Sequence, residues 1–463
     1  MSANTLTRDG RHIHLVGVGG IGVSALAPAL IDRGFRVSGS DPARNAITAR
    51  LSELGVNIYH EHEAGNINGA ELIVATSAAK DDNPEIAAAK AKGIEIWPRA
   101  KMLGALLNEY RSIVVTGAHG KTTLTALLTH TLASLGLDPT GFIGGEMPEG
   151  GNCRLGRGEW AIAEGDESDG SFIFLHPEVA IINNIDDDHL DFYENHQAIV
   201  QQFQRFIDGL PDHAWVLHSA DDANCRSLSL KPTQRRLTYG FSPEADIHGY
   251  AYVARSADWG CQAAYQGQPL GELRLQLPGR FQTHNALAAV ALAVALQLPV
   301  QETLRAVGAF RGVRRRMERK GEAHGVIVLD DYAHHPNEIK ATLEGLREQY
   351  SGRLIGVFQP HLYSRTLSLL DEFSRCFNQL DLLILTEIYP AREPVRHDMS
   401  GEMLLPRVRA EGVRAVYLPL LDEAAGFLRA ATQPGDVVVT LGAGNVWTVG
   451  EAFLHQQQQE AAR

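Results

Sequence analysis

Short apolar runs recur along this chain, and most of them end in a cluster of polar residues or glycines. Runs of this length predict buried β-strands, and the longer amphipathic or alanine-rich stretches between them predict α-helices. Strand and helix signals alternate along the chain, which is typical of α/β proteins with open, mostly parallel sheets. Breaks near residues 108 and 312 predict three domains, spanning 1–108, 109–312 and 313–463.

The first block alternates regularly between the two kinds of element. Its first strand is followed by a predicted helix that runs to about Arg33, and two further helices show apolar residues at helical spacing. The predicted strands are 12–18, 35–38, 72–75 and 94–97, and the later helices are 83–92 and 98–110.

A glycine-rich turn follows the first predicted strand. The segment Gly17-Val18-Gly19-Gly20-Ile21-Gly22 fits the pattern G-x-G-x-x-G, and Asp41 follows it by about twenty residues. Taken alone, this pattern is typical of an NAD-binding unit. The glycines let the backbone approach a diphosphate closely, so a nucleotide-sugar diphosphate fits the same geometry. Asp41 would accept a hydrogen bond from a ribose hydroxyl or cap a helix at Pro42.

A second glycine-rich turn opens the middle block, between an apolar strand at 113–115 and a helix at 124–135. The turn has the sequence Gly117-Ala118-His119-Gly120-Lys121-Thr122-Thr123. Backbone N–H groups at such a turn face an anion, the lysine adds a positive charge, and a threonine hydroxyl can reach Mg²⁺. Val115 stands where the first glycine of the full Walker pattern would fall. The turn still predicts a phosphate site.

Two acidic clusters follow strands predicted in the same block. Residues 160–163 lead into Glu164-Gly165-Asp166-Glu167-Ser168-Asp169, and residues 179–182 lead into 184–191, which include His189. Active sites of open α/β sheets lie at the carboxyl ends of strands, and Mg²⁺ takes oxygen ligands. Both clusters together with the phosphate turn favour a Mg²⁺ site, whereas any single acid is also compatible with a solvated loop or a helix cap.

Polar clusters again follow the strands predicted in the last block, at 325–329, 354–358, 382–386 and 436–440. This arrangement predicts a second open α/β sheet whose loops gather at one edge. Arg314, Arg315 and Arg316 precede it and would form either a solvated face or a phosphate clamp. In the middle block, Asn285 lies at the start of an alanine-rich predicted helix, where it would either cap the helix or contact a ligand.

Composition narrows the classes of function. The net charge of −13 and the 44% of hydrophobic residues fit packed domains and argue against a nucleic-acid or membrane-surface protein. The N-terminus lacks the apolar core of a signal peptide, and the longest apolar run, 286–296, is too short to cross a bilayer. We expect a reducing cytoplasm and neither a disulfide nor a zinc site, because the four cysteines are not closely paired. They are Cys153, Cys225, Cys261 and Cys376.

With these motifs in order, the chain resembles the Mur ligases of peptidoglycan synthesis, and within that family its alanine-adding branch. The resemblance implies an N-terminal Rossmann-like domain that holds a uridine diphosphate sugar and a central P-loop ATPase-like α/β domain that binds ATP and Mg²⁺. It also implies a C-terminal Rossmann-like α/β domain that closes on the amino acid. The matching segments are 17–22 with 39–41, 117–123, 164–171, 184–191, 312–318, 330–338, 358–366 and 442–445.

The activity implied by the resemblance is ATP-dependent amide formation between UDP-N-acetylmuramate and L-alanine. The lactyl carboxylate attacks the γ-phosphate to give an acyl phosphate, and the amine of the amino acid then displaces phosphate. Positioning and charge stabilisation would supply most of the rate. The resemblance also favours a cytoplasmic monomer or weak homodimer that binds neither nucleic acid nor membrane.

Residue roles follow from the matched positions. By resemblance, Lys121 steadies the β- and γ-phosphates, while Thr122, Glu164 and His189 hold Mg²⁺. Further nucleotide contacts are expected from Gly117, His119, Gly120, Thr123, Asn285 and Arg316. Sugar-nucleotide contacts are expected from Gly19, Gly20, Ile21, Gly22, Asp41 and Ser77, and substrate contacts in the third domain from Tyr332, His334, His361 and Arg365. The expected catalytic set is Lys121, Glu164, His189, His334, His361 and Arg365.

Several positions depart from the family pattern. Ala118 and Gly165 replace a threonine and an alanine, and Phe281-Gln282 stands where these ligases usually carry His-Asn near the adenine. Leu362 stands where the alanine-adding enzyme usually has arginine. A ligase of the same class that adds a preformed tripeptide or another small amino acid therefore stays an alternative. An NAD-dependent oxidoreductase rests only on the first glycine turn with Asp41, and a catalytically inactive nucleotide-binding regulator would leave the retained Lys121 and Glu164 without a role.

Overall fold

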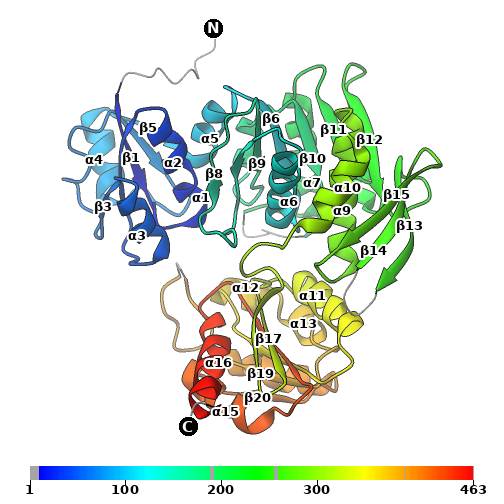
Figure 1. The fold of residues 1–463 in the computed structure, drawn as a ribbon. Coiled ribbons are helices and arrows are strands. Elements are labelled where there is room, and N and C mark those ends of the chain that lie inside the picture. Colours follow the sequence, from blue (N-terminus) through cyan, green and yellow to red (C-terminus); the bar gives the residue numbers. More distant parts are fainter. Residues whose placement is uncertain (1–9, 188–191, 255–258, 392, 462–463) are drawn as a thin grey trace. The chain divides into compact units, whose positions relative to one another are not determined.

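The computed structural model describes residues 10–187, 192–254, 259–391 and 393–461. Within these residues the strands form three sheets, each accompanied by helices (Figure 1). The described chain divides into two compact units. The first unit takes in the residues up to Ala251 with Cys261–Arg274 and His284–Phe310, and the second takes in the rest, chiefly the residues from Arg311 onward.

The first sheet is parallel throughout, with the strand order β3-β2-β1-β4-β5. Strands β1 and β4 are buried along their whole length, as expected for a parallel sheet covered by helices on both faces. All five strands therefore end at the same edge. The elements are β1 (His12–Val16), α1 (Ile21–Ser24), α2 (Leu26–Asp32), β2 (Arg36–Ser40), α3 (Ala46–Glu53), β3 (Asn57–Tyr59), β4 (Leu72–Ala75), α4 (Pro84–Lys92), β5 (Glu95–Pro98) and α5 (Arg99–Leu107).

A buried carboxylate ties parts of this sheet to its helices. Glu85, in the first turn of α4, accepts hydrogen bonds from the Ser40 hydroxyl at 2.6 Å and the Asn66 amide at 2.7 Å. Its carboxylate also lies 2.9 Å from Nδ1 of His62 and 3.4 Å from Nε2 of His14. Burial by itself would raise the pKa of Glu85, but these partners outweigh it and lower the pKa to about 2. The charged form of Glu85 therefore stabilises the fold.

The second sheet has the strand order β15-β14-β13-β12-β11-β10-β6-β9-β7-β8. Its central strands β9, β6 and β10 pair in parallel, so their carboxyl ends lie side by side. Helix α6 packs against β9 and α10. The strands are β6 (Arg111–Thr116), β7 (Thr140–Phe142), β8 (Cys153–Arg154), β9 (Trp160–Glu164), β10 (Val179–Ile182), β11 (Trp215–Ser219), β12 (Arg235–Gly240), β13 (Ile247–Ala254), β14 (Trp259–Tyr265) and β15 (Gln268–Leu275). The helices are α6 (Lys121–Ser134), η1 (Ser171–Phe174), α7 (His196–Gly209), α8 (Ala223–Ser227), α9 (Arg280–Ala295) and α10 (Val300–Ala309).

Helix α5 joins the cores of these two sheets. Leu103 and Leu106 of α5 are buried in the same apolar cluster as Phe172 of η1 and Phe206 of α7. Gly104 allows the close approach, because a Cβ at this position would lie 2.9 Å from the carbonyl oxygen of Phe174. Each fully buried leucine contributes roughly 1.5–3 kcal/mol. One continuous core therefore spans both sheets of the first unit.

The third sheet has the strand order β16-β17-β21-β18-β19-β20 and is parallel except for β16, which runs antiparallel to β17. The parallel strands again end at one edge. The strands are β16 (Glu318–Ala323), β17 (Val326–Asp331), β18 (Leu354–Phe358), β19 (Leu382–Leu385), β20 (Ala415–Tyr417) and β21 (Val437–Leu441). The helices are α11 (Pro336–Gln349), α12 (Tyr363–Ser368), α13 (Leu370–Arg375), η2 (Gly401–Leu404), α14 (Leu405–Ala410), α15 (Leu421–Ala431) and α16 (Trp447–Ala461).

The predicted α/β fold class is confirmed, with differences in detail. The predicted first helix is two helices, because Ala25 separates α1 from α2. Strand β16 was not predicted, since its polar and charged residues show no apolar alternation; such a strand suits the edge of a sheet. Helix α9 begins at Arg280, so Asn285 lies inside the helix and does not cap it. The exact domain boundaries stay predictions.

Two predicted absences concern the described residues. All four cysteines are free thiols, in agreement with the expectation of no disulfide. In the described part of the chain, no helix combines the length and the apolar content needed to cross a membrane.

Candidate active site

The first glycine turn lies at the end of β1. Gly17 and Val18 donate their N–H groups to the carbonyl of Ser40, so the turn is tied to the end of β2. Gly17 has a φ of +80°, and a Cβ there would lie 2.6 Å from a side-chain carbon of Thr76. Only glycine fits this position without strain. The turn then enters α1, whose first residues are Ile21 and Gly22.

Asp41 folds back on this turn. Its carboxylate accepts the N–H of Gly19 at 2.9 Å and the N–H of Ala43 at 2.9 Å. In this structure the carboxylate therefore occupies the place beside the Gly19 N–H that an anionic ligand group would take. The sequence left open whether Asp41 contacts a ribose or caps a helix. The structure adds a further partner, the backbone N–H of Gly19.

The second glycine turn connects β6 to α6. Gly117 has a φ of +133°, and a Cβ there would lie 2.8 Å from the carbonyl oxygen of Asn184. Gly120 has a φ of +83°. A Cβ there would lie 2.8 Å from the side-chain Nδ2 of Asn183 and 3.0 Å from Oδ1 of Asn285. Both glycines are therefore required by close packing of the turn on β10 and α9. The N-terminus of α6 offers its free N–H groups at this point.

Lys121 is the first residue of α6 and is largely buried, with 12% of its side chain exposed. Its ammonium donates to the carbonyl oxygens of Gly117 at 2.6 Å and Ala118 at 3.1 Å, and to Oε1 of Glu167 at 2.7 Å. Burial by itself would lower the pKa of Lys121. The nearby carboxylates of Glu167, Asp166 and Glu164 outweigh burial and raise that pKa. The lysine therefore stays protonated.

Thr122 and Glu164 lie next to each other beside this turn. The Thr122 hydroxyl is 3.0 Å from Oε2 and 3.2 Å from Oε1 of Glu164, and the N–H of Gly144 donates to Oε2 at 3.0 Å. A hydroxyl and a carboxylate are oxygen donors that suit Mg²⁺, which needs few protein ligands because it keeps several waters. The described residues contain no cluster of three or more His, Cys, Asp or Glu side chains arranged for a metal. His189, the third expected ligand, lies outside the described residues.

The phosphate turn is held from the side by amide side chains. The N–H of His119 donates to Oδ1 of Asn184 at 2.7 Å, and Nε2 of His119 lies 3.1 Å from Asp186. Asn183 donates to Oδ1 of Asn285 at 2.9 Å and to the carbonyl of His119 at 3.0 Å. Asn285 therefore lies beside the phosphate turn, and its contact with a nucleotide stays a prediction. Thr123 is also buried at the start of α6.

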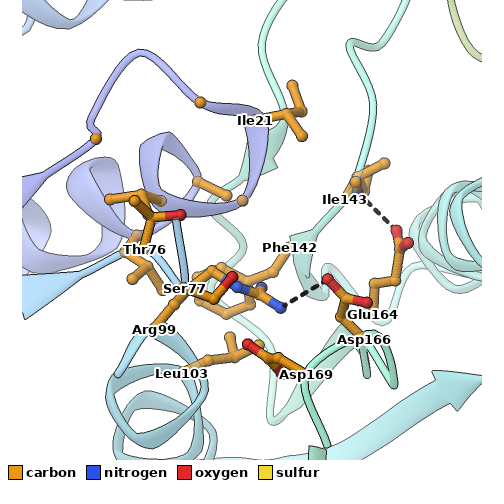
Figure 2. Close-up of a pocket in the computed structure, with 17 residues that line it drawn as sticks. Ile21, Thr76, Ser77, Arg99, Leu103, Phe142, Ile143, Glu164, Asp166 and Asp169 are labelled. Atoms are coloured by element: carbon orange, nitrogen blue, oxygen red, sulfur yellow. Dashed lines mark hydrogen bonds and ion pairs between the residues drawn. The ribbon is translucent and has the colours of Figure 1, made fainter. Parts of the chain in front are cut away.

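A cavity of about 270 Å³ lies within the first unit, between the first glycine turn and the end of β9. Gly20, Ile21 and Gly22 line it, together with Ser77 after β4; Gly19 does not. The opposite wall contains Glu164, Asp166 and Asp169 (Figure 2). The cavity therefore joins the two predicted ligand regions of the first unit.

Arg99 is the cation among the residues that line this cavity. It is the first residue of α5, and its guanidinium points toward Asp166, with 3.8 Å between Nη2 and Oδ2 (Figure 2). Burial would raise the pKa of Asp166, but Arg99 and Lys121 outweigh it and lower that pKa. A diphosphate or carboxylate ligand in the cavity would find its charge partner in Arg99.

In the second unit, an aromatic cluster lies where the strands of the third sheet end. The rings of Tyr332 and His334 meet edge to face with centroids 5.4 Å apart, and the ring of His361 lies 5.8 Å from that of His334. Tyr389 stacks on His361 at 5.8 Å and is 37% exposed. The structure thus brings together three expected substrate residues from two loops, Tyr332 and His334 after β17 and His361 after β18.

The arginines near this cluster differ in their partners. Arg365 places Nη1 3.3 Å from Nδ1 of His361. Arg316 lies over the Tyr332 ring at 4.9 Å. Arg315 lies over the same ring at 5.0 Å and also donates to Asp330 at 3.1 Å and to the carbonyl of Gly442. Arg315 is therefore tied to the third sheet, and the phosphate clamp of the three consecutive arginines stays a prediction.

Leu362 precedes α12 with a φ of +69°, and its side chain is buried. Leu362 therefore supplies no cation to the cluster. Arg365 is then the cation beside His361 in the described part of this cluster.

Arg99 and Tyr389 were not predicted from the sequence as site residues. Each follows a strand of a parallel sheet directly or within a few residues, which is the same signal that singled out Glu164 and His361. Glu167 was noted only as one acid in a cluster. Its contact with Lys121 depends on how two segments distant in the sequence pack together.

Three family models match this chain in order. The model described as Mur ligase family, catalytic domain, matches residues 12–111, the Mur ligase middle domain matches 115–293, and the Mur ligase, glutamate ligase domain, matches 315–444. The chain belongs to the Mur ligase family.

Within this family, the chain is similar to ligases that add alanine. The chain is 42% identical over 451 residues to the UDP-N-acetylmuramate–L-alanine ligase of Desulfosudis oleivorans, covering 97% of this chain and 99% of that protein. It is 41% identical over 459 residues to the enzyme of the same name from Desulfotalea psychrophila, covering 98% and 100%. The crystal structure of UDP-N-acetylmuramate-alanine ligase from Thermotoga maritima superposes with a TM-score of 0.85 at 30% identity, covering 97% of this chain and 99% of that one.

Proposed function

We propose that this protein is an ATP-dependent ligase that joins L-alanine to the lactyl carboxylate of UDP-N-acetylmuramate. The observation that carries the proposal is the cavity that runs from the first glycine turn to Glu164, whose carboxylate contacts Thr122 of the phosphate turn. A sugar nucleotide held at one end would present its carboxylate to a phosphate held at the other. The full-length similarity to ligases of this name supports the same activity.

In the phosphoryl transfer, the main task of the protein would be to position the two reactants and to neutralise charge. Lys121 would neutralise charge on the β- and γ-phosphates, and the N–H groups at the start of α6 would bind phosphate oxygens. The substrate carboxylate attacks the γ-phosphorus while the bond to the β-phosphate oxygen breaks, giving ADP and an acyl phosphate. Arg99 would hold the anionic substrate in place for this in-line attack.

Thr122 and Glu164 would hold Mg²⁺, with His189 as the third expected ligand. Mg²⁺ supplies charge stabilisation for the phosphate oxygens during the transfer. The Thr122 hydroxyl and the Gly144 N–H hold Glu164 in place, so its carboxylate is oriented beside the phosphate turn.

The amino acid would bind to the cluster of the second unit. Arg365 would pair with its carboxylate, and His361, stacked on Tyr389, would fix the direction of that arginine. The amine then attacks the acyl carbon, phosphate leaves, and the amine loses a proton. Because Leu362 adds no cation here, binding of the amino-acid carboxylate would rest chiefly on Arg365.

The test is phosphate release from ATP with UDP-N-acetylmuramate and a panel of amine substrates. The panel contains L-alanine, glycine, L-serine and the preformed tripeptide. We expect turnover to require ATP, UDP-N-acetylmuramate and L-alanine together. Turnover with the tripeptide and none with L-alanine would favour the other ligase of this class. Binding of NAD by calorimetry, without turnover, would favour the oxidoreductase alternative.

A further inference from the structure

The ammonium of Lys121 has a protein acceptor for each of its donors. A lysine ammonium has three N–H donors, and Lys121 has three acceptors: the carbonyl oxygens of Gly117 and Ala118 and Oε1 of Glu167. Two of these acceptors belong to the phosphate turn itself. Any contact from Lys121 to a phosphate must therefore replace one of them.

The carboxylate acceptor differs from the two carbonyls in charge and burial. Only 3% of the Glu167 side chain is exposed, so burial raises its pKa, whereas the ammonium of Lys121, 2.7 Å from its Oε1, favours the charged carboxylate. The backbone around Glu167 is held, because the Tyr193 hydroxyl donates to its carbonyl oxygen at 2.5 Å. Glu167 is thus an anion placed next to a phosphate-binding lysine in a site where water is scarce.

We infer that Glu167 is a placeholder for phosphate: it holds Lys121 while the turn is empty and competes with the phosphates of the nucleotide for that lysine. The inference rests on the proposed function, since it takes the ligand of the turn to be ATP. It makes Glu167 a positioning residue that acts through Lys121.

Charge decides the direction of the effect. If a phosphate oxygen and Glu167 share the ammonium, two like charges lie close together in a buried site, and their repulsion weakens nucleotide binding. If Lys121 leaves Glu167 altogether, a buried carboxylate loses its partner, which also costs free energy. Both routes make Glu167 unfavourable for ATP, whereas a residue that merely orients Lys121 would favour ATP.

The test replaces Glu167 with glutamine, which keeps the shape and removes the charge. We expect the Kd for ATP, measured by calorimetry on the full-length protein, to fall roughly tenfold in Glu167→Gln, the factor associated with one charged hydrogen bond. The melting temperature without nucleotide should fall, because the ion pair is lost. AMP lacks the β- and γ-phosphates that Lys121 would contact, so its Kd should not change.

Controls separate this effect from a change in net charge or in folding. Glu149→Gln removes one charge from an exposed position and should leave the ATP Kd unchanged. Glu167→Met serves as a second uncharged variant if the glutamine variant is not folded by circular dichroism. An ATP Kd that is unchanged or higher in the folded variants overturns the inference, and so does an equal gain for AMP. Failure of the unaltered protein to bind ATP would instead overturn the proposed function.

Discussion

The hydroxyl of Thr122 lies 3.0 Å from Oε2 of Glu164, across the gap between the phosphate turn and the end of β9. This contact places two hard oxygen donors side by side. We predict that Glu164→Gln lowers kcat at saturating ATP by roughly 100-fold or more, because the charged Mg²⁺ ligand is lost. The dependence of kcat on Mg²⁺ concentration measures it. Thr122→Ser, which keeps the hydroxyl, should retain most of the activity, and equal losses in both variants would contradict a metal role.

Lys121→Ala should abolish turnover while sparing the sugar-nucleotide site. The loss of the phosphate-binding charge is expected to lower kcat by roughly 100- to 1,000-fold. The Kd for UDP-N-acetylmuramate should stay within about threefold, since the first glycine turn lies on a different sheet and distant sites act independently. Calorimetry with the sugar nucleotide checks this, with the exposed Lys90→Ala as the control. A comparable loss of both in a folded variant would argue against two separate binding regions.

Arg99→Ala should affect the sugar nucleotide first. Removing the cation that lines the cavity is expected to raise the KM for UDP-N-acetylmuramate roughly 10- to 100-fold, the value of one charged hydrogen bond. The KM for L-alanine should not change. Lys101→Ala is the matched control, because Lys101 lies on the same helix but packs over Trp97. If both variants raise the KM for UDP-N-acetylmuramate equally, Arg99 does not bind the sugar nucleotide directly.

Arg365→Lys should impair use of the amino acid. Lysine keeps the charge but cannot bind a carboxylate through two N–H groups, so the KM for L-alanine should rise roughly tenfold. The KM for ATP should stay constant, as measured by steady-state phosphate release. Arg375→Lys, a largely exposed position on α13, is the control. An unchanged KM for L-alanine would place the amino-acid carboxylate elsewhere.

Glu85 gives a pH-dependent contribution to stability. Its pKa is lowered from 4.5 to about 2 in the folded protein, so its contribution is present above pH 4.5 and is lost as the pH falls toward 2. The shift corresponds to about 3 kcal/mol. We expect Glu85→Gln to be less stable than the unaltered protein at pH 7, with the difference shrinking below pH 4.5. Urea unfolding across this pH range measures it, and the exposed Glu53→Gln should run parallel to the unaltered protein.

The sequence predicted most strands and the turns that follow them, because apolar runs and glycines are local signals. It could not predict which acid of the segment after β9 faces which partner. Glu164 reaches Thr122, Asp166 faces Arg99, and Glu167 reaches Lys121. These choices depend on side-chain directions and on the packing of helices from two sheets. The order of the acidic residues in the sequence therefore does not determine which partner each one contacts.

Arg99 and β16 illustrate the same limit. Arg99 directly follows a strand, but that signal is shared by many residues, and its place in the lining of the cavity appears only in the structure. Strand β16 has no apolar alternation and forms because β17 offers a free edge. The positions of Asn285 and Leu362 likewise required the structure, since each depends on where a helix begins.

The core shared through α5 bears on how this chain can be divided for study. A fragment that stops after residue 108 would keep Leu103 and Leu106 but lose Phe172 and Phe206, so its apolar face would meet water and promote aggregation. A fragment from residue 311 onward would keep the buried residues of the two apolar clusters of the third sheet but would lose Phe281, which packs against one of them. Isolated binding studies are therefore better served by residues 1–310 kept together than by the first sheet alone.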